Sequence, residues 1–304
     1  MAAIDCGTNS IRLLVADLPP LSDGALTDVV RRMEIVRLGQ GVDRTGRLAP
    51  EAIERTRAAL ADYAKQIAAL GAERVRMVAT SATRDAANAA AFEEMVVRTL
   101  GTAAEVVSGA EEAGLSFTGA VRGLPAGVRP PYLVVDVGGG STEFVLGHSG
   151  VEHALSVDVG CVRMTERHLH DDPPTAAQVS AAEEDITAAV ERAFGVVSGG
   201  SAANLIGLAG SVTTVTALAL ALDSYQPERI HHARVSAADV ARVTAELLAM
   251  SREERLALPV MHPGRADVIG AGALILRVVM TLAGATSVLA SEHDILDGIA
   301  WSLA

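Results

Sequence analysis

Four short segments rich in Gly, Ser, Thr and Asn follow apolar stretches and could bind phosphate. They are Cys6–Ser10, Thr80–Arg84, Gly138–Thr142 and Gly210–Thr213. Small residues leave successive backbone N–H groups accessible, and such groups form anion-binding concavities. Where a strand gives way to a helix, as at Gly210–Thr213, the helix N-terminus adds partial positive charge. Arg84 adds planar donors that grip phosphate bidentately. Together the four segments indicate a phosphate-bearing ligand.

Carboxylates accompany these segments. Asp5 and Asp136 occupy equivalent entries to two of them, and Glu143 follows the second. Oxygen ligands of this kind bind Mg²⁺, which keeps several waters and bridges to substrate phosphates. Glu111 and Glu112 open an expected helix, where acidic residues often only complement the helix dipole. A carboxylate facing a ligand could instead be the general base that activates water, and the residues alone leave both interpretations open.

Several other kinds of site are excluded or disfavoured. No GxxxxGK[ST] segment is present, and Lys65 is the only lysine, so phosphate chemistry must depend on backbone loops, a metal and carboxylates. His231 and His232 are adjacent, and adjacent helical residues do not share a face, which favours a solvated loop over a metal pair. Cys6 and Cys161 are too few for a disulfide framework or zinc cluster, so we expect reduced thiols.

The overall charge limits the classes of partner. The 304-residue chain has a formal net charge of −12 and is 50% apolar with 3% aromatic residues. An acidic chain of this kind argues against a general nucleic-acid or membrane-surface binder. No apolar run reaches the roughly 18–20 residues of a membrane span, and the start lacks the basic and apolar regions of a signal peptide. We therefore expect a cytoplasmic protein with no nucleic-acid and no membrane partner.

Apolar strands alternate with helical patterns along the chain, which predicts an α/β fold. The Gly- and Pro-rich stretch 122–131 is the best candidate for a domain boundary. The expected strands are 2–17 (two strands joined by a turn), 74–80, 104–109, 132–147 (a hairpin), 151–157, 204–211 and 287–290, and the expected helices are 50–71, 89–101, 111–121, 161–170, 175–197, 212–222, 236–250, 265–284 and 294–303.

One pattern occurs twice. AIDCGTNSIRLLVAD and VVDVGGGSTEFVLG both place Asp-x-Gly-x-x-Ser between apolar strands, and one opens each half of the chain. Asp and Gly are common in strand connections, so chance is one explanation. The alternative is two related domains, each presenting a glycine-rich hairpin loop to a shared cleft.

The motifs as a set resemble those of the exopolyphosphatase / guanosine pentaphosphate phosphohydrolase (Ppx/GppA) family. VRLGQGVDRTGRL, VATSATRDA, SGAEEAGLSFTGAV, VVDVGGGSTEF, GCVRMTERHL, GLAGSVTT and HPGRADVI occur in the family's order, from residue 2 to about residue 300. The length resembles the short, two-domain actinobacterial exopolyphosphatases. The resemblance implies two ribonuclease-H-like domains of the actin / sugar kinase / Hsp70 superfamily flanking a cleft. We expect residues 1–122, with a closing helix at 292–304 packing back on them, and residues 123–291.

The resemblance also implies roles for individual residues. Glu112 is implied as the catalytic base, with Glu111 a less favoured substitute, and Arg84 as a contact to phosphate. Asp136 and Glu143 match the acidic pair associated with Mg²⁺, and we group Asp5 with them as a metal ligand. The phosphate-binding residues are implied to be Gly7, Thr8, Asn9, Ser10, Thr80, Ser81, Gly138, Gly139, Gly140, Ser141, Gly210, Ser211 and Thr213.

Two segments depart from the family pattern. The third loop reads Ala-Gly-Ser at 209–211 where the family has Gly-Gly-Thr, and Ile295-Leu296-Asp297-Gly298 stands where it often has Arg-Glu-Gly. Both departures bear on substrate length preference more than on the core chemistry.

The function implied is exopolyphosphatase: a phosphoanhydride hydrolase that releases orthophosphate from polyphosphate ends with Mg²⁺ or Mn²⁺. One alternative is removal of the 5′ phosphate of guanosine pentaphosphate, which would connect the protein to the stringent response. Another is a non-hydrolytic sensor that binds nucleotide or an alarmone such as guanosine tetraphosphate. A homodimer is kept as a candidate assembly.

Overall fold

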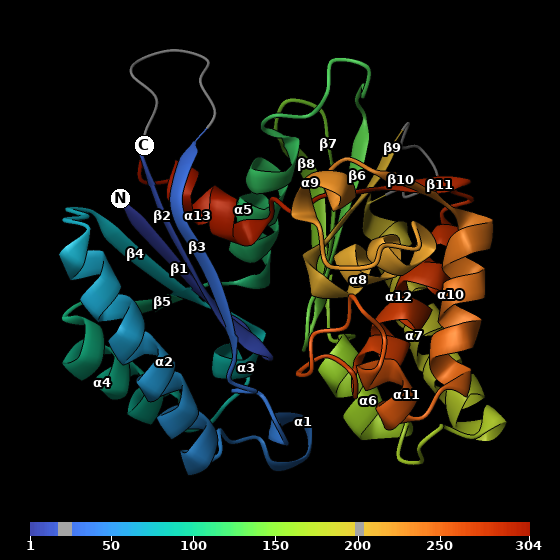
Figure 1. Ribbon diagram of the computed structural model, residues 1–304, viewed down its shortest axis with the longest axis horizontal. Coiled ribbons are helices and arrows are strands. Elements are labelled where there is room, and N and C mark those ends of the chain that lie inside the picture. The colour runs from blue at the N-terminus through green and yellow to red at the C-terminus, as the bar shows by residue number, and fades with distance from the viewer. Residues whose placement is uncertain (18–25, 198–203) are drawn as a thin grey trace. The chain divides into compact units, whose positions relative to one another are not determined.

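The chain forms two compact units in the computed structural model, which describes residues 1–17, 26–197 and 204–304. The first unit is Met1–Gly123 together with Ile295–Ala304, and the second is Leu124–Asp294. Each unit is built on its own β-sheet with helices packed against it, so the predicted α/β class is confirmed (Figure 1).

The first unit has a five-stranded sheet in the order β3-β2-β1-β4-β5. β2 is antiparallel to both β3 and β1, whereas β4 is parallel to both β1 and β5. The carboxyl ends of β1 and β4 therefore lie at the same edge. The strands are β1 (Ala2–Cys6), β2 (Ser10–Asp17), β3 (Thr27–Ile35), β4 (Val75–Ala79) and β5 (Ala104–Val106).

Helices cover both faces of this sheet, and β1 is therefore buried on both sides. Ile4 belongs to the core under α2 and α4, whereas Ala3 belongs to the core under α13 (Figure 1). The alternation follows from the two-residue period of a strand. The helices of this unit are α1 (Val42–Thr45), α2 (Pro50–Ala69), α3 (Ser81–Arg84), α4 (Ala89–Leu100), α5 (Gly109–Val121) and α13 (Ile295–Trp301).

The last helix, α13, packs against α5 and β1. A Cβ on Gly298 would lie 2.0 Å from the backbone oxygen of Leu115, so the two helices approach closely because residue 298 is glycine. Asp297 is buried and accepts hydrogen bonds from both Nη atoms of Arg31 on β3. The Ile295–Gly298 segment that departs from the family pattern therefore has a packing role in this chain.

The second unit has a six-stranded sheet in the order β10-β11-β9-β6-β7-β8. Its run β8-β7-β6-β9-β11 repeats the order and directions of the first sheet, as expected of two ribonuclease-H-like domains. The two Asp-x-Gly-x-x-Ser hairpins thus occupy equivalent places. The strands are β6 (Tyr132–Val137), β7 (Thr142–Gly147), β8 (Val151–Val157), β9 (Asn204–Leu208), β10 (Arg234–Ser236) and β11 (Ser287–Ala290).

The main core of this unit lies between its sheet and the apolar helices α7, α8, α10 and α12. α12 is buried along most of its length. The helices are α6 (Cys161–His168), α7 (Ala176–Val197), α8 (Ala209–Ala219), α9 (Pro227–Ile230), α10 (Ala237–Ala249), α11 (Arg252–Leu256) and α12 (Ile269–Leu282).

The structure differs from the sequence-based expectations in a few elements. β3 was not predicted, because its mixed charges and exposed positions hide the strand pattern of an edge strand. The strand predicted at 204–211 ends at Leu208, since Ala209 has a φ of 69°, which extended backbone does not adopt. The helix predicted from residue 265 begins at Ile269. Within the described residues, none of the helices has the length and apolarity needed to cross a membrane.

Candidate active site

The first loop, between β1 and β2, lies beside the segment that follows β4. Gly7 N–H donates to the Ser10 carbonyl over 2.9 Å and closes the hairpin. The hydroxyls of Thr8 and Ser81 are 3.0 Å apart, and both residues are buried. Thr80 N–H donates to the Cys6 carbonyl, because β1 and β4 are parallel neighbours. Two of the four predicted phosphate segments are therefore adjacent.

A segment after β3 fixes the backbone of the first loop. Gly39 N–H donates to the Thr8 carbonyl over 2.8 Å, and Arg37 N–H donates to the Asn9 carbonyl over 2.8 Å. A Cβ on Gly39 would lie 2.3 Å from the Thr8 methyl carbon, so only glycine allows this approach. Sequence reasoning did not assign a role to Gly39, although the VRLGQGV motif contains it.

The structure separates the two adjacent glutamates at the start of α5. Glu112 is 7% exposed, and Arg84 Nη1 donates to its Oε2 over 3.0 Å and to the Val107 carbonyl. Glu111 is exposed and forms an ion pair with Arg76. Its N–H is capped by the Ser108 hydroxyl, an ordinary helix start. Glu112 is thus the buried carboxylate, held beside the predicted phosphate contact.

The second loop, between β6 and β7, repeats the first and is covered by the start of α6. Gly138 N–H donates to the Ser141 carbonyl over 3.0 Å. Cys161 N–H donates to the Gly138 carbonyl, and Arg163 Nε donates to the Gly140 carbonyl over 2.7 Å. Gly160 lies so close that a Cβ would be 2.4 Å from the Gly139 carbonyl. The loop carbonyls are used within the unit, which suits an anion site because carbonyl oxygens repel phosphate.

Two carboxylates face each other beside this loop. Asp136 on β6 and Glu143 on β7 are register partners, so their side chains share one face of the sheet. They are 7% and 1% exposed, and Ser156 Oγ donates to Glu143 over 2.8 Å. Among residues 1–17, 26–197 and 204–304, no group of three or more His, Cys, Asp or Glu side chains is arranged to hold a metal ion. Two carboxylates alone fit Mg²⁺, which usually keeps waters and takes its remaining oxygens from substrate phosphates.

The third loop forms the first turn of α8 and is joined by a cation that sequence reasoning missed. A Cβ on Gly210 would lie 2.3 Å from the Cζ of Arg265, so the guanidinium rests directly on this glycine. Arg265 Nη1 also donates to the Thr214 hydroxyl over 3.2 Å. The HPGRADVI motif was the available signal, but only the fold shows which loop the arginine reaches.

Tyr225 connects the third loop to the end of β11. Its hydroxyl oxygen lies 2.7 Å from Thr213 Oγ1 and 2.7 Å from Glu292 Oε1. A phenol has one proton, and a carboxylate can only accept, so Tyr225 donates to Glu292 and the Thr213 hydroxyl donates to Tyr225. Burial raises the pKa of Tyr225, with the charge of Glu292 adding to the effect. The Thr213 side chain is therefore a fixed part of the loop wall.

His231 and His232 lie in a loop, as expected, but the prediction that they are solvated is wrong. Both are half-buried, their rings are stacked with centroids 3.6 Å apart, and His293 lies 4.4 Å from His231. Burial, followed by the charge of His293, lowers the pKa of His232. The planes of the two stacked rings are inclined by 30°, so His231 and His232 pack against each other in a cluster with His293.

The two cysteines are both free, as predicted, and both are buried. Burial raises the pKa of the Cys6 thiol, with a smaller effect from Asp5, and burial also raises that of Cys161. Raised pKa values keep both thiols protonated and unreactive.

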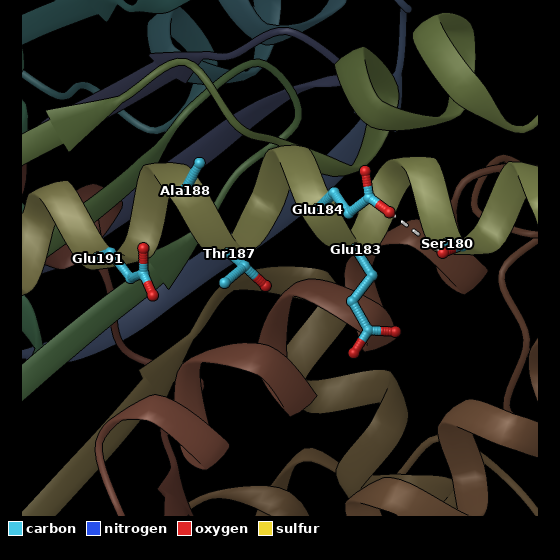
Figure 2. A pocket seen from close by; sticks show the side chains of 6 residues that line it. All are labelled: Ser180, Glu183, Glu184, Thr187, Ala188 and Glu191. Carbon is cyan, nitrogen blue, oxygen red and sulfur yellow. Dashed lines mark hydrogen bonds between the residues drawn. The ribbon is translucent and has the colours of Figure 1, made fainter.

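A shallow hollow of about 350 Å³ lies on α7, away from the three loops. Figure 2 shows Glu184 turned toward Ser180 and Glu183 directed to the other side of the helix. Glu183 forms an ion pair with Arg277 on α12. The hollow contains none of the predicted site residues.

The predicted residues thus group by unit. In the first unit the structure brings Thr8 to Ser81 and Arg84 to Glu112. In the second unit it places Asp136 opposite Glu143, beside the second loop. In both units the first strand of the hairpin ends in a loop that a glycine N–H closes, Gly7 in the first unit and Gly138 in the second.

Two such units, each a mixed sheet with helices packed against it, define an α/β protein, and sequence comparison identifies the family. The profile of the Ppx/GppA phosphatase family matches residues 20–303, and the chain belongs to this family. It is 53% identical to Exopolyphosphatase 2 of Mycobacterium tuberculosis over 314 aligned positions, which cover 100% of this chain and 98% of that protein.

Two further proteins are similar to this chain over nearly its whole length. A crystal structure of an exopolyphosphatase-like protein matches with a TM-score of 0.95 and 43% identity, covering 99% of this chain and 98% of that chain. A guanosine-5′-triphosphate,3′-diphosphate pyrophosphatase of Vibrio atlanticus is 29% identical, and the match covers 99% of this chain but only 59% of that protein.

Proposed function

We propose that this protein is an exopolyphosphatase that removes the terminal phosphate of inorganic polyphosphate and releases orthophosphate. The observation that carries the proposal is the buried Glu112 carboxylate held by Arg84 in the first unit. Full-length similarity to a protein named Exopolyphosphatase 2 supports it.

The chain's own residues supply the catalytic groups. Glu112 accepts a proton from the attacking water as the new oxygen–phosphorus bond forms. The bridging oxygen of the shortened chain leaves with the electron pair of the broken P–O bond. Arg84 holds the Glu112 carboxylate in place and offers its remaining donors to the terminal phosphate. The loops at Gly7–Ser10 and Gly138–Ser141 present backbone N–H groups to the negative charge that develops.

Asp136 and Glu143 would hold a divalent cation, Mg²⁺ or Mn²⁺, beside the second loop. When bound, the cation neutralises the charge of phosphate oxygens. The protein's net charge of −12 repels an anionic substrate and cannot supply this neutralisation. We also propose that the two units correspond to the two ribonuclease-H-like domains and that the enzyme works in the cytoplasm.

Replacing Glu112 by Gln tests this function. Glu112→Gln keeps the shape of the side chain but cannot take a proton, so phosphate release from polyphosphate should fall by roughly 10²–10⁴-fold. Glu111→Gln is the matched control, because Glu111 is exposed and pairs with Arg76, and it should retain near wild-type turnover. Near-normal release by Glu112→Gln, measured as orthophosphate at saturating Mg²⁺, would refute the role of Glu112.

Guanosine pentaphosphate is the second candidate substrate, since the family also includes proteins named for hydrolysis of this nucleotide. Removal of its 5′ phosphate needs the same base and phosphate loops and would connect the protein to the stringent response. A sensor that binds an alarmone without hydrolysis has no use for a buried, positioned Glu112. Binding of guanosine tetraphosphate, with no phosphate release from any substrate, would instead support the sensor function.

A further inference from the structure

The third loop begins with a residue in a strained backbone conformation. Ala209, the first residue of α8, has a φ of 69°, which lies in the left-handed region. A residue with a Cβ is disfavoured there by about tenfold relative to glycine, because its Cβ approaches the following carbonyl oxygen. Such a conformation persists only where the surrounding structure holds it. The third loop therefore depends on contacts that other segments make with it.

The segment that follows α8 returns to the start of this helix and makes such a contact. Tyr225 lies between α8 and α9, and its hydroxyl oxygen is 2.7 Å from Thr213 Oγ1. Thr213 is buried and lies four residues after Ala209, which is about one turn of the helix. The Thr213 hydroxyl donates its proton to Tyr225, so this hydrogen bond ties the first turn of α8 to a residue outside the helix.

Tyr225 is in turn anchored on a neighbouring strand. Its hydroxyl donates to Glu292 Oε1 over 2.7 Å. Glu292 follows β11, which is parallel to β9, so it lies at the edge of the sheet where the third loop begins. Glu292 N–H donates to His231 Nδ1 over 3.2 Å, and Ser291 N–H donates to the Gly207 carbonyl on β9 over 2.9 Å. The anchor is thus bound to the same sheet that carries the third loop.

We propose that Tyr225 is a positioning residue that keeps the third loop in a phosphate-binding conformation, with Glu292 as its anchor and Thr213 as the point that it holds. In this role the Thr213 hydroxyl stabilises the loop and does not contact phosphate. The backbone N–H groups at the start of α8 are then the groups offered to the substrate. The inference rests on the proposed function and deepens it, because it names the residues that set the affinity of one phosphate subsite.

Equilibrium binding of inorganic tripolyphosphate tests the inference, measured by calorimetry with Mg²⁺ on the full-length Glu112→Gln protein, which binds without turnover. Adding Tyr225→Phe removes the hydroxyl and keeps the ring. Binding should weaken by about tenfold, the factor by which a left-handed alanine is disfavoured once its support is lost. Tyr132→Phe is the matched control, because the Tyr132 hydroxyl donates to the Val128 carbonyl at the end of β6 opposite the second loop. It should leave binding unchanged.

A rescue by Ala209→Gly separates positioning from a direct contact. Glycine adopts left-handed backbone without steric cost, so the loop no longer needs the Tyr225 hydroxyl. Adding Ala209→Gly to Tyr225→Phe should restore tripolyphosphate binding to within about threefold of the Glu112→Gln protein. Thr213→Val breaks the same hydrogen bond from the other side and should show the same loss and the same recovery.

The outcomes that would overturn the inference are distinct. Equal binding by the Tyr225→Phe and Tyr132→Phe proteins would show that the hydroxyl holds nothing that the ligand needs. A loss that Ala209→Gly does not restore would show that the hydrogen bond acts other than through the loop backbone. If Tyr225→Phe does not fold, Thr213→Val with and without Ala209→Gly gives the same comparison, and an unrestored loss there would make Thr213 a direct phosphate contact and overturn its anchoring role.

The binding and hydrolysis assays fail independently. Tripolyphosphate binding that follows the expected pattern, with no orthophosphate released from polyphosphate by the wild-type protein, would remove the proposed function and keep the inference. Orthophosphate release by the wild-type protein, with tripolyphosphate binding unaffected by Tyr225→Phe, would do the reverse.

Discussion

At the scale of single residues, burial separates groups that the sequence presents as equivalent. Glu111 and Glu112 are neighbours in sequence, yet one pairs with Arg76 at the surface and the other is buried against Arg84. Residue types alone left both interpretations of this pair open, and only the family resemblance favoured Glu112. The distinction depends on which side of α5 faces β4, which is a property of the fold.

His232 gives a residue-scale prediction about pH. Because its pKa in the folded protein lies below the ordinary value of 6.5, the unfolded chain binds the proton first as the pH falls. The contribution of a neutral His232 to the free energy of unfolding is therefore fully present above about pH 6.5. It decreases as the pH falls from there to the lower pKa of the folded protein. His231 stacks on the His232 ring, and His293 lies against His231.

The melting temperature should accordingly decrease between pH 7 and pH 5, with part of the decrease due to His232. His232→Asn removes the titrating group and suits the φ of 62° at this position, since Asn tolerates left-handed backbone. Its melting temperature, measured by circular dichroism, should fall less steeply with decreasing pH. An identical slope in both proteins would contradict the role of His232.

At the scale of elements, glycines decide how closely helices and loops approach. Gly39 lies against Thr8 and Gly160 lies against Gly139, so both hairpin loops are closed by a glycine that follows the third strand of the unit. The paired motifs predicted the two hairpins correctly. They could not predict these closing segments, because the approach depends on where β3 and β8 end in space.

The contact between α13 and α5 gives the element-scale prediction. Gly298→Ala would place Cβ 2.0 Å from the Leu115 backbone oxygen, and a backbone atom cannot move aside cheaply. Overpacking of this kind typically costs about 1–3 kcal/mol, so thermal denaturation should occur several degrees lower. Gly114→Ala, in α5, has nothing within 4 Å of its added Cβ and should stabilise the helix by up to about 1 kcal/mol. Equal melting temperatures for the two variants would show that the close approach is not required.

At the scale of the whole molecule, the chain builds one sheet topology twice and gives the copies different chemistry. The alternation of strands and helices and the repeated Asp-x-Gly-x-x-Ser were sufficient to predict the α/β class and the paired hairpins. Arg265 was missed because its partner, Gly210, is distant in sequence. Another feature was also missed: the cross-strand partner of Asp5 is the cation Arg12, whereas that of Asp136 is the anion Glu143, and cross-strand partners are known only from the fold.

The central claim concerns the substrate of the whole enzyme. The most direct test measures orthophosphate released from polyphosphate of defined length and from guanosine pentaphosphate, by the same protein at the same Mg²⁺ concentration. We expect polyphosphate to be shortened from its end with the larger kcat/KM, and chelation of the metal to stop the release. Release from guanosine pentaphosphate with none from polyphosphate would contradict the claim.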